Sequence, residues 1–249
     1  ADLLPGFLAY NSAYDPLPPE PAAFARLPRD ERVLIDLESP YYKMGISNYL
    51  MAYGLSTPSG YASQYPRAYG ELVRALGGRA GDRRVEFAAV NTRALRAFRV
   101  GAARAWRVGR CEVLPDPADR LRRLADPSFD PDRTAILETA APPLSEDSAG
   151  TVEKTGEREY LTDGAGPCLL VVGETVDAGW RCEVDGKPAP ILRANHAQRA
   201  VALGPGRHRV AFFYRPRTLL PGLGLTAVAA AIGAGWAARR LLNSSWRRH

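Results

Sequence analysis

The sequence predicts an α+β fold that is mostly β, with a mixed α/β N-terminal lobe, a C-terminal antiparallel β-sandwich and one C-terminal transmembrane helix. Three observations lead to this prediction. Short apolar or alternating runs separated by tight turns fill the second half, apolar residues at helical spacing occur in the first half, and an uncharged run lies near the C-terminus. The predicted parts are the lobe over 1–139, a linker over 140–151, the sandwich over 152–216, the transmembrane helix over 219–240 and a basic cytoplasmic tail over 241–249.

The N-terminal lobe contains the clearest soluble helix. Between residues 63 and 76, Tyr65, Tyr69, Leu72, Val73 and Leu76 fall at helical spacing, and two glycines follow as a stop. Aromatic and apolar side chains on one face predict that this helix packs against a core. The other elements predicted in the lobe are strands over 32–38 and 85–90, one or two strands over 99–114, and a short helix over 116–125 with a proline in its first turn.

Beyond the loop-like residues 140–151 the pattern is β throughout. Cys168–Glu174 is an apolar run of strand length, and Asp185-Gly186 is typical of a primed hairpin turn. The further strands are predicted over 179–185, 187–192, 198–203 and 207–214. Five or six short antiparallel strands with tight turns favour a small β-sandwich.

The uncharged run Leu219–Ala238 is 20 residues long and is followed by arginines. At about 1.5 Å per residue it covers roughly the 30 Å hydrocarbon core of a bilayer, which favours a membrane-spanning helix. Its many Ala and Gly residues leave a buried helix of a soluble protein as the alternative. Ala227, Ala231 and Gly235 recur every four residues, which would let a second helix approach closely.

Composition narrows the classes of function. The net charge of +6 suggests nucleic acid, but the arginines are scattered and no nucleic-acid-binding motif accompanies them, so membrane lipid is the expected partner. We find no spacing typical of a metal site, a catalytic triad, a phosphate loop or a dinucleotide motif, and we expect no cofactor. Cys168 and Cys182 lie on predicted consecutive strands and would be able to pair in an oxidising space.

Leu169–Pro216 carries an ordered set of short motifs, Gly179-Trp180, Asp185-Gly186-Lys187, Arg193-Ala194-Asn195 and Pro205-Gly206-Arg207-His208. With these motifs the stretch resembles the C-terminal β domain of the bacterial multi-span membrane proteins of the YfhO family. Two further stretches agree with that family, Asn48–Val73 and Arg104–Glu138. The chain differs from the family at Val176-Asp177-Ala178, where an aromatic pair is usual.

The resemblance implies a bacterial cell-membrane protein with an extracytoplasmic N-terminal domain and a cytoplasmic C-terminus. Such proteins are thought to be GT-C-type glycosyltransferases that move sugar from a polyprenyl-phosphate donor to envelope polymers. No catalytic residue can be carried over, because the family keeps its acidic catalytic residue in the first extracytoplasmic loop among the preceding membrane spans, and the resemblance covers neither that loop nor those spans. The expected partners are therefore a polyprenyl-phosphate sugar or envelope glycan, and other spans or subunits. The alternative is a single-pass envelope protein with a non-catalytic structural or carbohydrate-binding β domain.

Two clusters are candidate binding residues. Seven of the eleven tyrosines lie between residues 41 and 69, and aromatic rings beside amides commonly bind sugars. We hypothesise that Tyr53, Tyr61, Tyr65 and Arg67 line a glycan or phospho-sugar groove, with Arg67 pairing to phosphate. The alternative is that the tyrosines pack the core of the predicted helix.

The second cluster comprises Trp180, Arg193, Asn195 and His196. Trp180 is expected in the sandwich core, and Arg193 and Asn195 are expected to hold a turn through side-chain bonds to the backbone. His196 has no carboxylate or nucleophile near it in the sequence, so it is a weak candidate for a general base.

Overall fold

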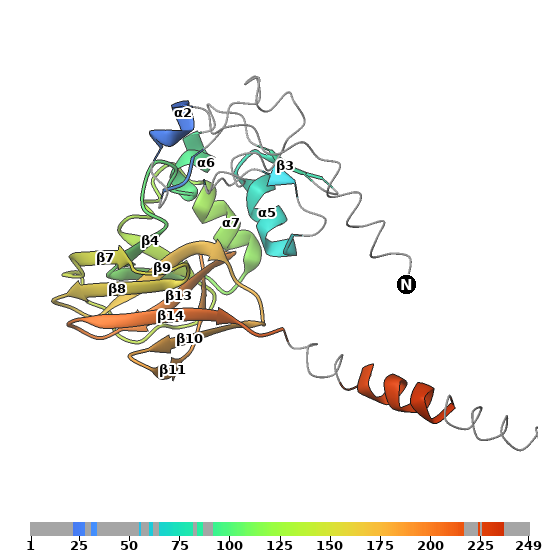
Figure 1. Cartoon of the computed structure of the whole chain (residues 1–249). Coiled ribbons are helices and arrows are strands. Elements are labelled where there is room, and N and C mark those ends of the chain that lie inside the picture. Colours follow the sequence, from blue (N-terminus) through green and yellow to red (C-terminus); the bar gives the residue numbers. More distant parts are fainter. Residues whose placement is uncertain are drawn as a thin grey trace, which may run out of the picture.

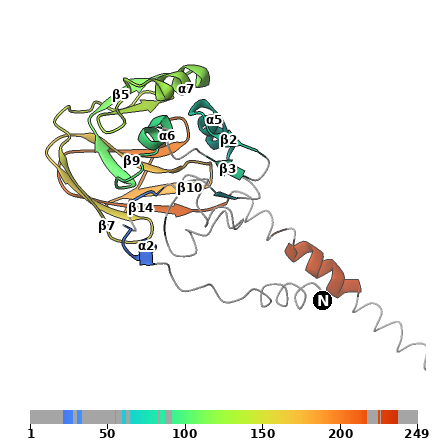
Figure 2. The same cartoon turned by 90° about the horizontal axis from the view of Figure 1, so that it is seen from above.

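The computed structural model describes residues 22–27, 31–33, 55, 60–61, 65–81, 84–86, 92–216, 224 and 226–236. Three layers make up most of this part: a group of helices, a six-stranded sheet and a five-stranded sheet (Figure 1). The helices are α2 (Ala22–Ala25), α5 (Arg67–Ala75), α6 (Thr92–Ala97) and α7 (Pro117–Ala125). Figure 2 shows that α5, α6 and α7 gather on the side of the molecule away from β10 and β14.

The six-stranded sheet has the order β4-β9-β13-β12-β6-β5 and forms the central layer. Its strands are β4 (Ala105–Val108), β5 (Arg110–Val113), β6 (Thr134–Leu137), β9 (Cys168–Thr175), β12 (Leu192–Ala194) and β13 (Gln198–Leu203). The five-stranded sheet has the order β11-β10-β14-β8-β7. Its strands are β7 (Gly150–Lys154), β8 (Glu159–Gly164), β10 (Trp180–Val184), β11 (Lys187–Ala189) and β14 (His208–Tyr214).

A small three-stranded sheet lies beside α5 (Figure 1). It has the order β1-β3-β2, with β1 (Gly60–Tyr61), β2 (Arg79–Ala80) and β3 (Arg84–Glu86). Glu31 and Arg32 add only isolated bridges to Ala103 and Val100. Residues 34–38 of the strand predicted over 32–38 lie outside the described part of the chain.

The central sheet is buried on both faces, which explains why β9 reads as an unbroken apolar run. Leu170 and Val172 pack with Val210 and Phe212 of the five-stranded sheet. Leu169 of the same strand faces the opposite side and packs in a second cluster with other residues of the central sheet, including Trp106, Ala135 and Leu137. A third cluster lies under the helices and joins Leu72, Val73, Ala97, Leu124, Phe129, Ile136 and Ala197.

Several predicted elements are confirmed. The helix predicted over 116–125 is α7, and Asp116 caps it by accepting hydrogen bonds from the backbone amides of Ala118 and Asp119. The strand predicted over 198–203 is β13. Asp185 and Gly186 have φ values of 53° and 76°, as a primed hairpin turn requires.

The predicted fold class needs correction, first in the way the sandwich is built. The central sheet takes β4, β5 and β6 from residues that we assigned to the N-terminal lobe, so the sheet crosses the loop over 140–149. In addition, β5 and β6 run parallel, with α7 as the connection between them, so the sandwich is not wholly antiparallel. A parallel pair needs a long crossover, and the 114–133 connection through α7 supplies it.

The second correction concerns the predicted transmembrane helix. No helix in the described part of the chain is long and apolar enough to cross a membrane. Residues 226–236 are helical and exposed, and Figure 1 draws this helix apart from the sandwich. Ala227, Ala231 and Gly235 lie on this helix and are exposed. The other residues of the predicted span, 219–223, 225 and 237–240, lie outside the described part of the chain, as does the predicted tail over 241–249.

Candidate ligand-binding groove between the helices and the central sheet

A groove of about 470 Å³ lies where α5 and α7 meet the ends of strands β6, β9 and β12 of the central sheet. We call it the α5–α7 groove. Five segments line it: the first turn of α5, the start of α7, the end of β6, β12 with the turn that follows it, and the loop after β9. Its volume is within the range of about 300–1,000 Å³ typical of small-molecule sites. Its ionisable lining residues are Arg67, Glu71, Arg120, Glu138, Asp177, Arg193 and His196.

His196 joins the two halves of the groove. Its side chain is only 3% exposed, and Nε2 lies 3.0 Å from Oε2 of Glu71 on α5. Burial lowers the pKa of His196 below its ordinary value, and the hydrogen bond with Glu71 opposes this shift. A neutral imidazole that donates from Nε2 leaves Nδ1 as an acceptor, and Nδ1 has no partner among the described residues.

The turn that carries His196 is held by Asn195. Both residues adopt a left-handed backbone, with φ values of 46° and 66°, and Asn is one of the few residues that enter this region readily. The Asn195 Oδ1 accepts from the backbone amide of Ile136 at 2.9 Å, and Nδ2 donates to Gln198 at 2.8 Å. The predicted turn-holding role of Asn195 is therefore confirmed, and it fixes His196 against β6.

Two arginines of the groove lining share one carboxylate, that of Glu138. Arg193 Nε lies 3.2 Å from Glu138, and Arg120 Nη2 lies 3.5 Å from the same carboxylate. Arg120 is nearly buried and also donates to the carbonyl oxygens of Leu114 and Pro115, at 2.7 and 2.6 Å. These bonds hold Arg120 in place before any ligand arrives.

The charges of the α5–α7 groove balance. Three arginines face three carboxylates, and His196 is neutral. A balanced set of this kind offers donors and acceptors without a net charge. A ligand with many hydroxyl groups, each of which donates and accepts, fits this lining better than a strongly charged ligand.

The structure brings one of the four predicted glycan-binding residues into this groove. Arg67 lines it with a side chain that is 91% exposed, and Nε lies 2.7 Å from Glu71. The Arg67 bond holds the pKa of Glu71 below its usual value, and the bond with His196 adds to this. The ring of Tyr65 packs against the helical core cluster, and its hydroxyl donates to the carbonyl of Gly81. Tyr53 and the side chain of Tyr61 lie outside the described part of the chain.

Trp180, from the second predicted cluster, lies away from the groove lining and packs against the sandwich core. The guanidinium of Arg199 lies over its ring at 3.6 Å from the centroid, and Arg199 pairs with Glu174. Arg193 and His196 do line the groove. The sequence suggested no partner for His196 because Glu71 is 125 residues away along the chain.

The cysteines offer no reactive thiolate. Cys111, Cys168 and Cys182 are all free, so the disulfide considered from the sequence is not formed. Burial raises the pKa of each thiol, and that of Cys182 to about 12. Within the described residues, no three His, Cys, Asp or Glu side chains gather as a metal site requires.

No protein-family model, curated protein or solved structure matches this chain.

Proposed function

We propose that this chain is a sugar-binding, non-catalytic domain of a cell-envelope protein of the YfhO type, placed on the extracytoplasmic side of a bacterial membrane. In this role it holds the sugar of a donor or acceptor for a glycosyl transfer whose catalytic residues lie outside the chain. The proposal rests on residues 65–216 and does not involve the C-terminal helix.

The balanced lining of the α5–α7 groove carries the proposal. Carboxylates accept from sugar hydroxyls, and arginines donate to hydroxyl and ring oxygens. The lining does both within about 470 Å³, and most of its polar groups are already oriented by bonds to each other or to the backbone. Such preorganisation lowers the entropy lost on binding.

Direct binding to the full 249-residue chain tests the proposal. The probes are methyl α-glucoside, methyl α-galactoside and N-acetylglucosamine, with glycerol as the hydroxyl control, in saturation-transfer NMR and calorimetry. We expect at least one sugar to bind more tightly than glycerol. Arg67→Ala should weaken that sugar about tenfold without lowering Tm, because one charge-assisted hydrogen bond is lost from an exposed side chain.

The matched control is Arg122→Ala on α7, which removes an arginine that is 79% exposed and lies outside the groove. Sugar binding no better than glycerol, or equal binding by the two variants, contradicts the proposal. Tyr61→Ala in the same assay tests the predicted tyrosine whose side chain lies outside the described part of the chain.

The envelope location has its own test, because sugar binding alone does not establish it. An antibody against residues 65–216 is used to blot membrane and soluble fractions of cells that carry the natural gene. A band in the membrane fraction, several times heavier than 27.1 kDa, is expected if catalytic spans are attached to this domain. A band found wholly in the soluble fraction contradicts the envelope role. The sugar site is then tested by the binding measurements alone.

A further inference from the structure

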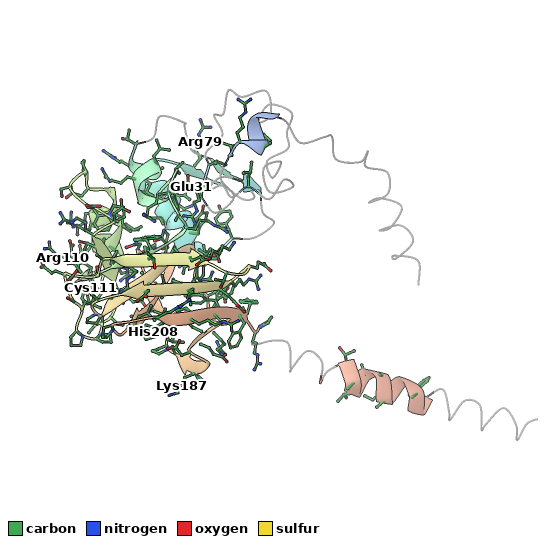
Figure 3. The ribbon with its side chains drawn as sticks, turned by 60° about the vertical axis from the view of Figure 1, so that its left-hand side comes forward. Glu31, Arg79, Arg110, Cys111, Lys187 and His208 are labelled. Carbon is green, nitrogen blue, oxygen red and sulfur yellow. The ribbon has the colours of Figure 1, made fainter. Side chains whose placement is uncertain are left out.

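A second groove, of about 520 Å³, lies where β4 and β7, edge strands of the two sheets, come together. Four arginines line it. We call it the β4–β7 groove. Arg107 and Arg110 come from β4 and β5, Arg99 follows α6, and Arg133 precedes β6. Figure 3 shows Arg110 at the outer edge of the body, beside Cys111. The four arginines are scattered along the sequence and meet only through the fold.

Two of these arginines are neutralised within the groove. Arg99 Nε lies 2.5 Å from Oδ1 of Asp132, and Arg110 Nη2 lies 2.6 Å from Glu146. The Arg110 bond holds the pKa of Glu146 below its usual value, and the charge of Arg133 contributes to this. Asp132 and Glu146 are the only carboxylates in the described lining.

The other two arginines have no carboxylate partner among the described residues. Arg107 is 8% exposed and donates only to neutral oxygens, those of Ser148, Thr162 and Gly166, at 2.8–3.1 Å. The side chain of Arg133 is exposed and makes no hydrogen bond or ion pair within the described part of the chain. Four cations against two carboxylates leave an excess of two positive charges in the lining.

Trp106, the aromatic residue of the groove, offers no ring face for a nucleobase, which argues against a nucleotide as the ligand. Trp106 is 7% exposed, its Nε1 donates to the carbonyl of Pro131 at 2.8 Å, and the Arg99 guanidinium covers its ring at 4.4 Å from the centroid. The indole therefore has no free face on which a nucleobase could stack. Without a stacking platform, the features left for recognition are guanidinium groups, which match tetrahedral oxyanions.

We propose that the β4–β7 groove is a binding site for a phosphate group, held over the buried charge of Arg107 by Arg133 and by the guanidinium N–H groups of Arg110 that its bond with Glu146 does not use. A phosphate dianion would neutralise the excess charge, and two guanidinium groups from different segments would grip its oxygens. This site is separate from the α5–α7 groove and does not depend on the proposed sugar binding.

Thermal unfolding of the full chain tests the site, with sodium phosphate compared with sodium chloride at equal ionic strength. For a Kd of about 1 mM, phosphate at about 20 mM should raise Tm by about 4 °C relative to chloride. Arg133→Gln and Arg110→Gln should each weaken phosphate about tenfold, and neither should lower Tm in chloride by more than about 2 °C, because both side chains are exposed.

Arg122→Gln is the matched control, since it removes an exposed, ion-paired arginine that lines neither groove. Glycerol 1-phosphate, tested beside inorganic phosphate, separates a phosphoester ligand from the free ion. Tighter binding of the ester indicates a phosphorylated sugar or polyol, and tighter binding of inorganic phosphate indicates the free ion. Equal Tm in phosphate and chloride, or an unchanged phosphate shift in Arg133→Gln and Arg110→Gln, overturns the proposal.

Discussion

The α5–α7 groove and the β4–β7 groove are lined by the same kinds of charged side chain, but their linings differ in net charge. In the α5–α7 groove the buried arginine, Arg120, lies beside a carboxylate, and the lining is neutral overall. In the β4–β7 groove the buried arginine, Arg107, donates only to neutral oxygens, and the lining keeps a positive excess. The number of arginines alone therefore does not set the ligand class. What matters is whether a carboxylate from another segment reaches them.

The largest expected loss of stability comes from replacing Arg107, the buried arginine that lines the β4–β7 groove. Arg107→Met removes the donor for Thr162 and for the carbonyls of Ser148 and Gly166, and it should lower the free energy of unfolding by about 3 kcal/mol. Chemical denaturation measures this. The control, Arg110→Met, replaces a half-exposed arginine and should cost about 0.5 kcal/mol or less. An equal loss of unfolding free energy in the two variants would mean that the hydrogen bonds of Arg107 do not stabilise this side of the groove.

In the α5–α7 groove the neutral side-chain amide of Asn195 holds the turn that carries His196. Asn195→Ala leaves the buried amide of Ile136 without its acceptor and places alanine at a φ of 46°, so we expect a loss of about 2 kcal/mol. Asn195→Asp keeps the acceptor and should cost less than the alanine substitution. Denaturation of the two variants side by side checks the order, and the reverse order would contradict the role given to the Asn195 oxygen.

Replacing the carboxylate of Glu138 should give the α5–α7 groove a positive excess, as in the β4–β7 groove. Glu138→Gln leaves Arg120 and Arg193 without their shared negative partner, at a cost of about 1 kcal/mol, and gives the α5–α7 groove a positive excess. In a protein that also carries Arg110→Gln and Arg133→Gln, this change should restore part of the phosphate-dependent rise in Tm. The same background without Glu138→Gln is the control. Absence of any restored rise would show that charge balance does not decide between the grooves.

The smallest effect should appear in the pH dependence of stability. Burial lowers the pKa of His196 in the folded state, so the unfolded chain binds a proton that the folded chain does not. Stability should therefore fall as pH drops through the ordinary histidine value of about 6.5, until the lowered folded pKa is reached. Glu71, whose pKa is also lowered, contributes stability that is lost only at more acidic pH.

His196→Asn should flatten the pH dependence near neutrality, because asparagine tolerates the left-handed backbone and does not titrate. Denaturation at a series of pH values from 5 to 8 measures the slope. His208→Asn removes a different histidine, on β14, and should leave the slope due to His196 in place. An unchanged slope in His196→Asn would mean that the imidazole of His196 is not the group responsible.

Elements with a local signal could be predicted from the sequence. The capping of α7 by Asp116, the apolar run of β9 and the turn at Asp185-Gly186 each depend on residues within a few positions of one another. The transmembrane prediction over 219–240 depended on a run without charge, and it was wrong for the described residues, where no helix is long and apolar enough to cross a membrane.

The candidate sites depend on contacts that no local pattern encodes. Arg67 was identified from composition, but its groove requires Glu138 and His196 from distant segments. His196 appeared to lack a carboxylate because Glu71 lies on a helix early in the chain. The parallel pairing of β5 with β6 was missed because we predicted no strand over 134–137, the residues that form β6.

The sequence by itself determined the predominance of strands, the capped α7 helix and the tight turns, because backbone preference and side-chain period act over a few residues. Only the tertiary structure decided that one sheet crosses the predicted boundary. It also decided which arginines meet carboxylates and which keep their charge. The physical reason is that the net charge of a groove is a sum over side chains that only folding brings within a few ångströms of each other.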